Sequence, residues 1–254
     1  MTSALTLSTL GRWAFSRRDH DDDGSPSTPQ LSAYLRATEV WWTPPEQSRE
    51  YRLKRSLDVF GALVGLVLLA PMMGVCALVV KLSSDGPALF RQQRIGFRGT
   101  PFTILKFRTM QLDNRGLPLT VSGDRRVTRM GNLLRRSKLD EFPQLINVLL
   151  GEMSLVGPRP EVPELVTGYA PYMDVIAVSK PGITSYASIK YVNEADLLQT
   201  VEDPLRLYHQ VIMPDKMRYE RIYCEHQGIC TDLRVILVTL LALLYPPVRR
   251  RFTL

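Results

Sequence analysis

The sequence contains little of the side-chain chemistry on which hydrolases and structural metal sites commonly depend. Only three of its 254 residues are cysteine and only three are histidine. The cysteines, Cys76, Cys224 and Cys230, are widely spaced, which argues against a disulfide framework and fits reducing surroundings. Cys224, His226 and Cys230 offer only three ligands at an unusual spacing, so ordinary residues are favoured over a metal site. No histidine accompanies a nucleophile elbow, and a hydrolase triad is not supported.

Motifs for nucleotide binding are also missing. There is no Walker loop, and the glycines of "GFRG" at residues 96–99 have the wrong spacing for a dinucleotide fingerprint.

Positively charged residues, in contrast, are plentiful. The net charge is +7, and because residues 1–50 hold five arginines and seven acidic residues, the remainder carries +9. Residues 91–138 alone contain twelve Lys or Arg against two Asp, so an anionic partner is expected there.

Residues 1–50 are predicted to form a flexible N-terminal extension. They begin without a cleavable-signal pattern and contain "RRDHDDDGSPSTPQ", which is too polar and too rich in Pro and Ser to bury a core. The acidic triplet at residues 21–23 is interpreted as a solvated charge run rather than a metal site.

A long apolar run follows this extension. Residues 59–80, "VFGALVGLVLLAPMMGVCALVV", contain no charged side chain. At 1.5 Å per residue, a straight helix of this length would reach about 33 Å, which is enough to cross a bilayer. The alternative, a buried helix of a soluble domain, is disfavoured by the length and purity of the run. The run therefore predicts a membrane segment.

Pro71 lies near the middle of this run, where it removes a backbone donor and bends or breaks a helix. Basic residues flank both ends of the run, and such residues favour the cytoplasmic side of a membrane. A helix that enters the bilayer, breaks at Ala70 and Pro71 and returns keeps both basic clusters on one face. A re-entrant membrane helix over residues 51–83 is therefore favoured, with a kinked span as the alternative.

The remainder of the chain predicts a compact domain of helices with one small β-hairpin. Turn signals near residues 85–87 and 96–101, with alternation in "PFTILKF", indicate the hairpin. Further segments are predicted as a helix over 132–150 interrupted near Ser137, a loop-rich region over 171–184, and helix over 194–223 broken at Pro204 and Pro214. The apolar stretch 235–245, followed by three arginines, indicates an interfacial helix, with a core helix as the alternative. The predicted fold class is α-rich α+β.

The adjacent acids Asp140 and Glu141 stand between a basic group and an apolar helix. Because Pro143 is favourable only in a first helical turn, Asp140 is expected at the helix start, where it could act as a cap. The same position would keep a carboxylate ionised among anion-binding donors, which suits a nucleophile that attacks phosphorus. A glycosidase pair is disfavoured, because consecutive helical residues diverge by about 100°. Cap and nucleophile both stay open on local sequence.

The candidate phosphate ligands are basic or hydroxyl side chains in strands and tight turns. They comprise Arg135 and Arg136 before the acid pair, Lys106 and Arg108 in "KFRTM", Arg159 in "GPRP", and Lys180 and Thr184 in "KPGIT". A Mg²⁺ ion bridging Asp140 and phosphate oxygens would fit among them. Taken singly, each of these residues is equally consistent with an exposed structural role.

Four segments in order resemble the bacterial sugar transferase family, the monotopic polyprenyl-phosphate phosphoglycosyl transferases. They are "KRSLDVFGALVGLVLLAP", "GPALFRQQRIGFRGTPFTILKFRTM", "LRRSKLDEFPQLINVLLGEMSLVGPRP" and "KPGIT". The resemblance implies an enzyme at the cytoplasmic face of the bacterial inner membrane. Such an enzyme transfers a sugar 1-phosphate from a UDP-sugar to undecaprenyl phosphate and releases UMP. In that family the aspartate of the Asp-Glu pair, here Asp140 with Glu141, forms a covalent phosphosugar intermediate beside Mg²⁺.

The sequence departs from the family at two places. Ala70-Pro71 stands where many relatives have Ser-Pro, and "SYASIKYVNE" follows Gly-Ile-Thr where many have Gly-Trp, so the sugar is not identified. The predicted organisation is an extension over residues 1–50, a membrane helix over 51–83 and a catalytic domain with interfacial helices over 84–254.

The expected partners are undecaprenyl phosphate, a UDP-sugar and inner-membrane lipids. The alternative function is a basic membrane-anchored module that binds anionic lipids or a partner protein without catalysis. Nucleic acid is not expected as a partner, because the basic cluster adjoins an apolar run and lacks a recognisable binding motif. The oligomeric state is not determined by the sequence, and a homodimer is one option.

Overall fold

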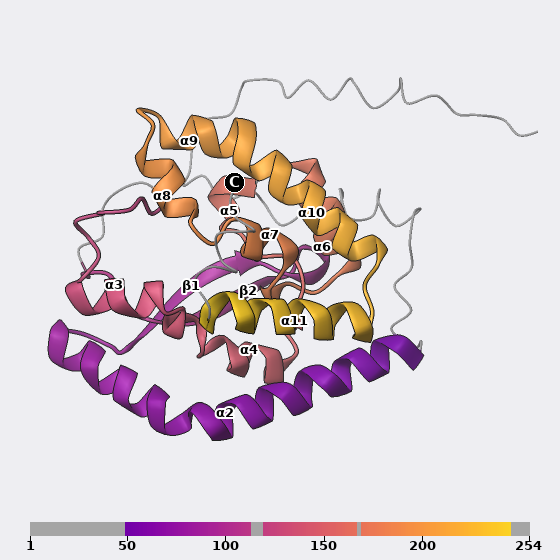
Figure 1. The fold of residues 1–254 in the computed structure, drawn as a ribbon, viewed down its shortest axis with the longest axis horizontal. Coiled ribbons are helices and arrows are strands. Elements are labelled where there is room, and N and C mark those ends of the chain that lie inside the picture. Colours follow the sequence, from indigo (N-terminus) through magenta and orange to yellow (C-terminus); the bar gives the residue numbers. More distant parts are fainter. Residues whose placement is uncertain (1–48, 113–118, 167–168, 245–254) are drawn as a thin grey trace, which may run out of the picture.

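The computed structural model describes residues 49–112, 119–166 and 169–244, and it is rich in helix with two small sheets (Figure 1). The α-helices are α2 (Arg49–Ser83), α3 (Arg129–Arg136), α4 (Gln144–Leu150), α5 (Pro163–Val166), α6 (Ala170–Val178), α7 (Tyr186–Lys190), α8 (Glu194–Gln199), α9 (Pro204–Leu207), α10 (Met213–Glu225) and α11 (Ile229–Leu244). The short turns are η1 (Phe97–Gly99), η2 (Leu139–Glu141) and the π-turn η3 (Tyr208–Ile212). The strands are β1 (Leu89–Ile95), β2 (Pro101–Phe107), β3 (Ser154–Val156) and β4 (Gly182–Thr184). The α-rich α+β class is confirmed, whereas the predicted extension over residues 1–50 lies almost wholly outside the described residues.

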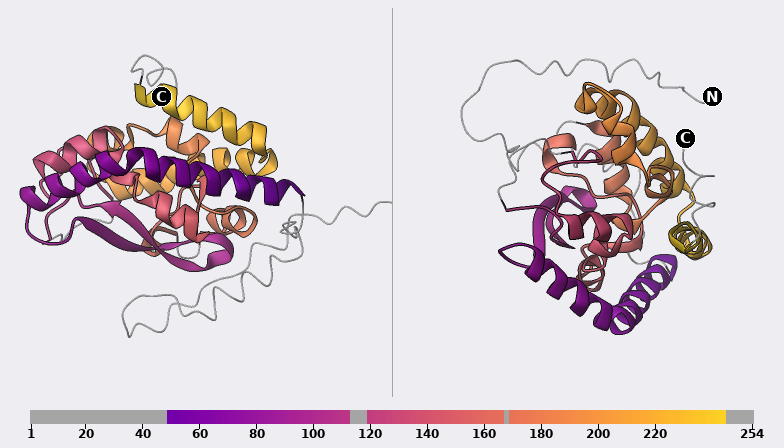
Figure 2. Two further views of the ribbon diagram at one scale, coloured as in Figure 1. Left: turned by 90° about the horizontal axis from the view of Figure 1, so that it is seen from below. Right: turned by 60° about the vertical axis from the view of Figure 1, so that its left-hand side comes forward.

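Helix α2 is a single helix of 35 residues, with Pro71 in its interior. The predicted break at Ala70 and Pro71 is therefore corrected to a bend within a continuous helix. Figures 1 and 2 show that α2 curves near its middle as it passes along one side of the molecule. An interior proline is a recognised cause of such a bend, because it removes one hydrogen bond and crowds the preceding turn without ending the helix.

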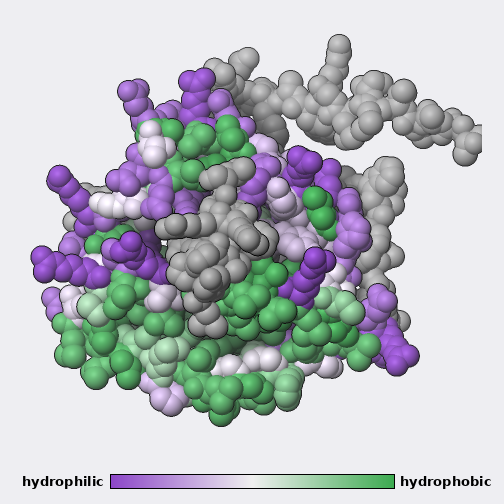
Figure 3. All heavy atoms as spheres, in the orientation of Figure 1, coloured by the Kyte–Doolittle hydropathy of each residue, from purple (hydrophilic) through white to green (hydrophobic). Residues whose placement is uncertain are grey.

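The outer surface of α2 is apolar and exposed. Phe60 and Val67 are each 67% exposed, Leu68 is 72% exposed and Leu82 is 79% exposed. The space-filling view shows this surface as a hydrophobic band along the lower edge of the molecule (Figure 3). Within the described part of the chain, α2 is the one helix long and apolar enough to cross a membrane. A buried helix of a soluble domain would not present these side chains to solvent, so α2 is suited to contact lipid.

The inner surface of α2 is tied to the rest of the molecule by polar side chains near its N-terminal end. Lys54 donates to Asp232 of α11 over 2.6 Å and to the Val156 carbonyl of β3 over 3.0 Å. Asp58, which is 4% exposed, accepts hydrogen bonds from the Ser154 hydroxyl and the Leu155 amide, both at 2.9 Å. The N-terminal end of α2 is thus part of the core of the domain.

The predicted hairpin is confirmed. Strands β1 and β2 pair in antiparallel register from Leu89 opposite Phe107 to Ile95 opposite Pro101, with η1 in the connection. Helix α4 docks on β2 through Asn147, whose side chain accepts from the Leu105 amide at 3.1 Å. It also donates to the Thr103 carbonyl at 2.8 Å. The hairpin is therefore held against the segment that follows the acid pair.

Strands β3 and β4 pair in parallel and bring the two proline-containing turns together. Gly157 and Gly182 face each other so closely that a Cβ on either would meet the backbone of the opposite segment. Only glycine fits at such an approach. The segments "GPRP" and "KPGIT", whose facing glycines are 25 residues apart in the chain, form one packed unit.

The loop-rich prediction for residues 171–184 is wrong, because α6 occupies its first half. Pro171 stands in the first turn of α6, where the missing backbone donor costs nothing. Pro214 likewise stands in the first turn of α10, which continues from the π-turn η3 without a gap. The predicted break before Pro204 is present between α8 and α9.

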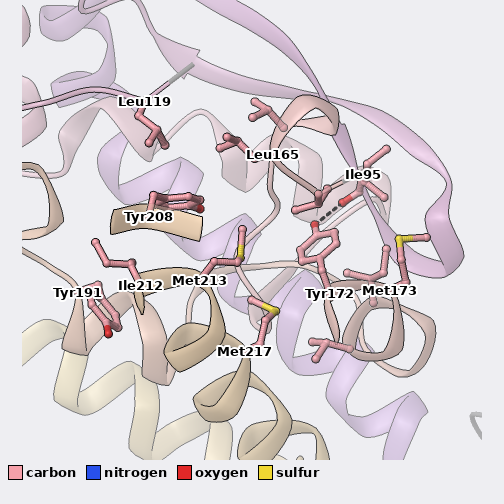
Figure 4. Close-up of a cluster of buried hydrophobic side chains, with 14 of the residues drawn as sticks. Ile95, Leu119, Leu165, Tyr172, Met173, Tyr191, Tyr208, Ile212, Met213 and Met217 are labelled. Atoms are coloured by element: carbon pink, nitrogen blue, oxygen red, sulfur yellow. Dashed lines mark hydrogen bonds between the residues drawn. The ribbon is translucent and has the colours of Figure 1, made fainter. Parts of the chain in front are cut away.

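The largest hydrophobic cluster lies between α6, α10 and η3 (Figure 4). Tyr172 is fully buried, and its hydroxyl donates to the Ile95 carbonyl at 2.9 Å and accepts from the Glu161 amide at 3.0 Å. This one side chain connects α6 to the end of β1 and to the segment after the "GPRP" turn.

Helix α11 has one side buried against the domain and one exposed apolar side. Val235 and Asp232 are buried against the domain, while Leu237 is 57% exposed and Leu240 is 51% exposed. The exposed side continues the apolar surface of α2, which α11 contacts. The three arginines at residues 249–251 lie outside the described residues.

Candidate active site

A cavity of about 1690 Å³ lies between the hairpin, α3, η2, the "GPRP" turn, α7, α8 and α10. Pockets for a single small ligand usually measure about 300–1,000 Å³, so this cavity has room for more than one substrate. The part of the lining formed by β2, the segment before α3, α3, η2 and the "GPRP" turn is strongly basic, and we call it the basic end. Its cations are Lys106, Arg125, Arg126, Arg129, Arg135, Arg136, Lys138 and Arg159.

The acid pair lies at the basic end, in the turn η2 between α3 and α4. Asp140 is 7% exposed and Glu141 is 8% exposed. The chain reaches this turn through Lys138, whose φ of 58° is left-handed. Asp140 does not cap the following helix, which was one of the two roles that the sequence left open, because η2 forms its own turn and Pro143 occupies the position before α4. Asp140 is therefore available for another role.

Glu141 is held by two cations. Its Oε1 atom accepts from the Lys106 ammonium at 2.9 Å and from the Arg159 guanidinium at 2.8 Å. Burial by itself would raise the pKa of Glu141, but Arg159 and Lys106 outweigh it and hold that pKa well below its usual range. Glu141 is thus an ionised anchor that orients two basic side chains.

Asp140 is in a different environment, although it is the adjacent residue. Its Oδ1 atom is buried and has no hydrogen-bond partner among the described residues. Burial raises the pKa of Asp140, and the neighbouring Glu141 raises it further. Lys106 and Arg135 act in the opposite direction. A buried carboxylate oxygen without a partner is uncommon, so Asp140 is the candidate reactive group of this cavity.

The arginines at the end of α3 both line the cavity. Arg135 donates to the Thr109 hydroxyl at 2.7 Å, and burial lowers its pKa while Asp140 raises it. Arg136 is exposed at the cavity mouth. The predicted phosphate ligands that the structure brings together around the acid pair are Arg135, Lys106 and Arg159, while Arg136 lines the same cavity.

The other predicted ligands have structural partners. Arg108 lines the cavity but donates to the carbonyls of Ser84 and Asp85, just beyond α2. Thr184 also lines it, and its hydroxyl lies 2.7 Å from the Thr239 hydroxyl of α11. Lys180 does not line the cavity; it donates to the Gly151 carbonyl at 2.8 Å, at the C-terminal end of α4.

Three charged residues that the sequence did not single out also line the cavity. They are Glu161, Glu194 and Lys216, with Tyr208 beside them. Glu161 directly follows the "GPRP" turn, and that position could have drawn attention to it. Glu194 and Lys216 belong to helices far apart in the chain, and no local pattern connects them.

The side chains fit a divalent cation that shares its ligands with a substrate. Among the described residues, no three His, Cys, Asp or Glu side chains gather as a closed metal site. Mg²⁺ is commonly bound by one or two carboxylates together with substrate phosphates. The unpartnered oxygen of Asp140 matches that mode of binding.

The fold and cavity define a domain with one long, exposed apolar helix and a buried acid pair in a basic cavity. The profile of the bacterial sugar transferase family matches residues 49–246. The chain therefore belongs to the bacterial sugar transferase family.

Characterised relatives extend this assignment. A UDP-glucose:undecaprenyl-phosphate glucose-1-phosphate transferase of Caulobacter vibrioides is 38% identical over 89% of this chain and 80% of its own length. An Escherichia coli transferase of the same name is 36% identical over 74% of this chain. An Aeromonas hydrophila UDP-N-acetylgalactosamine-undecaprenyl-phosphate N-acetylgalactosaminephosphotransferase is 32% identical over 76% of this chain. The chain spans 39% of the length of the Escherichia coli relative and 44% of the Aeromonas relative.

Proposed function

We propose that this protein transfers a sugar 1-phosphate from a UDP-sugar to undecaprenyl phosphate, releases UMP, and so begins the assembly of a lipid-linked glycan. The observation that carries the proposal is the unpartnered Oδ1 of Asp140 inside a cavity lined by cations. The family and the relatives described above supply the reaction class.

Asp140 is the nucleophile of the proposed reaction. A carboxylate oxygen of Asp140 attacks the β-phosphorus of the donor, and the bond from that phosphorus to the bridging oxygen breaks. UMP leaves with the electron pair, and an aspartyl phosphosugar forms. A phosphate oxygen of undecaprenyl phosphate then attacks the same phosphorus, which breaks the bond to Asp140 and restores the carboxylate.

The remaining residues of the basic end neutralise and position phosphate. Arg159 and Lys106 are held in place by Glu141, so their charges are fixed before the donor arrives. Such preorganised charge is the main requirement of phosphoryl transfer. Arg135 and Arg136 approach the same region from α3. Bound Mg²⁺, held by Asp140 and donor phosphates, would supply further neutralisation of charge.

The membrane geometry suits a lipid acceptor. Ala242 and Leu243 of α11 line the cavity, and α11 also contributes to the exposed apolar surface. An acceptor whose chain lies in the bilayer could therefore present its phosphate at the cavity. Membrane attachment by α2 places the catalytic domain at the lipid surface.

The two ends of α2 support the re-entrant arrangement. Lys54, near the N-terminal end, bonds to β3 and α11 of the domain. Ser84, just beyond the C-terminal end, accepts from Arg108 of the same domain. A straight span would separate these ends by the thickness of a bilayer, whereas a bent helix returns both to one face. We place that face in the cytoplasm.

The nucleophile is tested by Asp140→Asn in the full chain, purified in detergent and supplied with undecaprenyl phosphate, Mg²⁺ and a panel of UDP-sugars. The amide is a poor nucleophile, so UMP release should fall by on the order of 10³-fold or more. Asp174→Asn is the matched control, because Asp174 is 48% exposed and outside the cavity. It should retain wild-type release.

Two results would overturn the proposal. Full UMP release by Asp140→Asn would remove Asp140 as nucleophile. Absence of release from every UDP-sugar by the wild-type protein, with Mg²⁺ and acceptor present, would remove the transferase function itself.

A further inference from the structure

One part of the cavity lining, within electrostatic reach of Arg159, combines carboxylates with a lysine. The Lys216 ammonium pairs with Glu194 Oε2 at 2.6 Å and lies 3.7 Å from Glu161 Oε1. It also lies 4.9 Å from the centre of the Tyr208 ring. We call these four residues the carboxylate end of the cavity. They come from three separate elements and the segment after "GPRP", and all of them line the cavity.

These charges are well buried. The side chains of Lys216 and Glu161 are 4% and 7% exposed, while that of Glu194 is 23% exposed. Buried ion pairs rarely stabilise a fold more than apolar side chains of the same size would. A mixed ionic cluster at a cavity wall is therefore more readily explained by ligand binding than by stability.

The carboxylate end adjoins the reacting end through one short segment. Arg159 contacts Glu141 of the acid pair, and Glu161 follows it two residues later. Arg94 fixes this segment from β1 by donating to the Pro160 carbonyl at 3.0 Å, and it lies 3.9 Å from Glu161. A group bound at the carboxylate end is thus next to a phosphate bound by Arg159.

The proposed donor has two parts that carry hydroxyl groups, the sugar and the nucleoside. These two parts lie at different distances from the β-phosphate, where the reaction takes place. The sugar is bonded directly to the β-phosphate, whereas the nucleoside lies one phosphate further away. The part nearest Arg159 is therefore the sugar. Carboxylates accept hydrogen bonds from sugar hydroxyls, and an ammonium group donates to the hydroxyl oxygens.

We propose that Glu194, with Lys216 and Glu161, binds the hydroxyl groups of the donor sugar and determines which neutral sugar is accepted. This inference rests on the proposed function, because it needs a nucleotide-sugar donor at Asp140. Glu194 is the principal residue, since it is the most exposed carboxylate of the cluster. A charge-assisted hydrogen bond to one hydroxyl distinguishes epimers that differ only in the direction of that hydroxyl.

The test compares kcat/KM for UDP-glucose and UDP-galactose, and for their N-acetyl analogues, in wild type and Glu194→Gln. Loss of one charge-assisted hydrogen bond should change the ratio between epimers by about 10- to 100-fold. Glu194→Asp keeps the charge beside Lys216 but withdraws it by one methylene. It should fold even if Glu194→Gln does not, and it should change the same ratio.

Asp215→Asn is the matched control, because Asp215 lies beside Lys216 on α10, pairs with Lys190 at 2.7 Å and does not line the cavity. Its epimer ratio should equal that of wild type. Equal loss for all sugars in both Glu194 variants would overturn the sugar-binding role while leaving the transferase function standing. Wild-type protein inactive with every UDP-sugar would instead overturn the proposed function.

Discussion

Lys106 is a cation of the active site whose pKa lies close to the working pH of a cell. Burial lowers its pKa to about 8, with Arg159 acting in the same direction and Glu141 opposing it. Lys106 is therefore mostly cationic at pH 7 and loses its charge as the pH rises through 8. Its ordinary pKa of 10.5 applies in the unfolded chain.

We predict that kcat/KM for the UDP-sugar falls about tenfold per pH unit above pH 8, because neutral Lys106 no longer attracts phosphate. Lys106→Arg should move this decline beyond pH 10, since arginine stays charged. The decline cannot come from unfolding through this group. Between pH 8 and 10.5 the unfolded chain binds more protons at this position, so its contribution to stability rises with pH. A decline that persists unchanged in Lys106→Arg would contradict the assignment.

Individual site residues differed in how far the sequence could predict them. Asp140, Glu141 and Arg159 stand in short motifs, and the structure brings them together. The cap role of Asp140 failed, because a three-residue turn with a left-handed Lys138 before it cannot be distinguished from a helix start by composition. Glu194 was missed because its partner lies in another helix.

The C-terminal end of α4 shows how basic residues serve an element rather than a substrate. Arg55 donates to the carbonyls of Val148 and Leu149, at 2.6 and 2.9 Å, and Lys180 donates to Gly151. The carbonyls of the last helical turn lack the amides of a following turn, although the Val148 carbonyl also accepts from the Gly151 amide at 3.0 Å, and the helix dipole favours cations there. Two segments distant in the chain are joined by this cap.

We predict that Lys180→Gln lowers stability by about 0.5–1 kcal/mol and leaves the KM for the UDP-sugar unchanged. Arg55→Gln should cost more, about 1–2 kcal/mol, because it serves two carbonyls. Thermal unfolding in detergent and initial-rate kinetics measure the two effects. A tenfold rise in KM for Lys180→Gln would contradict this structural role and show that Lys180 contributes to binding the UDP-sugar.

Elements were predicted well where periodicity was strong and poorly where proline was the main signal. The hairpin and α2 followed from alternation and from an uninterrupted apolar run. Pro171 and Pro214 suggested a loop and a break, yet both lie in first turns of helices, where proline is favourable. The parallel pairing of β3 with β4 joins residues too far apart for local sequence to indicate.

At the scale of the whole molecule, we predict that both ends of the described chain lie on one side of the membrane. Tags placed before Arg49 and after the C-terminus should be equally accessible in inside-out vesicles and equally protected in intact cells. The reason is that Lys54 and Ser84, at opposite ends of α2, both bond to the same domain. If the two tags were found on opposite faces of the membrane, α2 would be a membrane-spanning helix and the re-entrant topology would be wrong.

The contacts that the inner surface of α2 makes with the domain limit how a water-soluble variant of this enzyme could be designed. A chain shortened to begin after Ser83 would remove Lys54 from Asp232 and Asp58 from the Ser154 hydroxyl, and it would uncover the apolar side chains that pack against α2. Removing one partner of a buried ion pair costs about 3–5 kcal/mol, which is a large share of the stability of most domains. Replacing outward leucines such as Leu68 with polar residues keeps every one of these hydrogen bonds. Water solubility is therefore to be sought by redesigning the lipid-facing side of α2, not by deleting the helix.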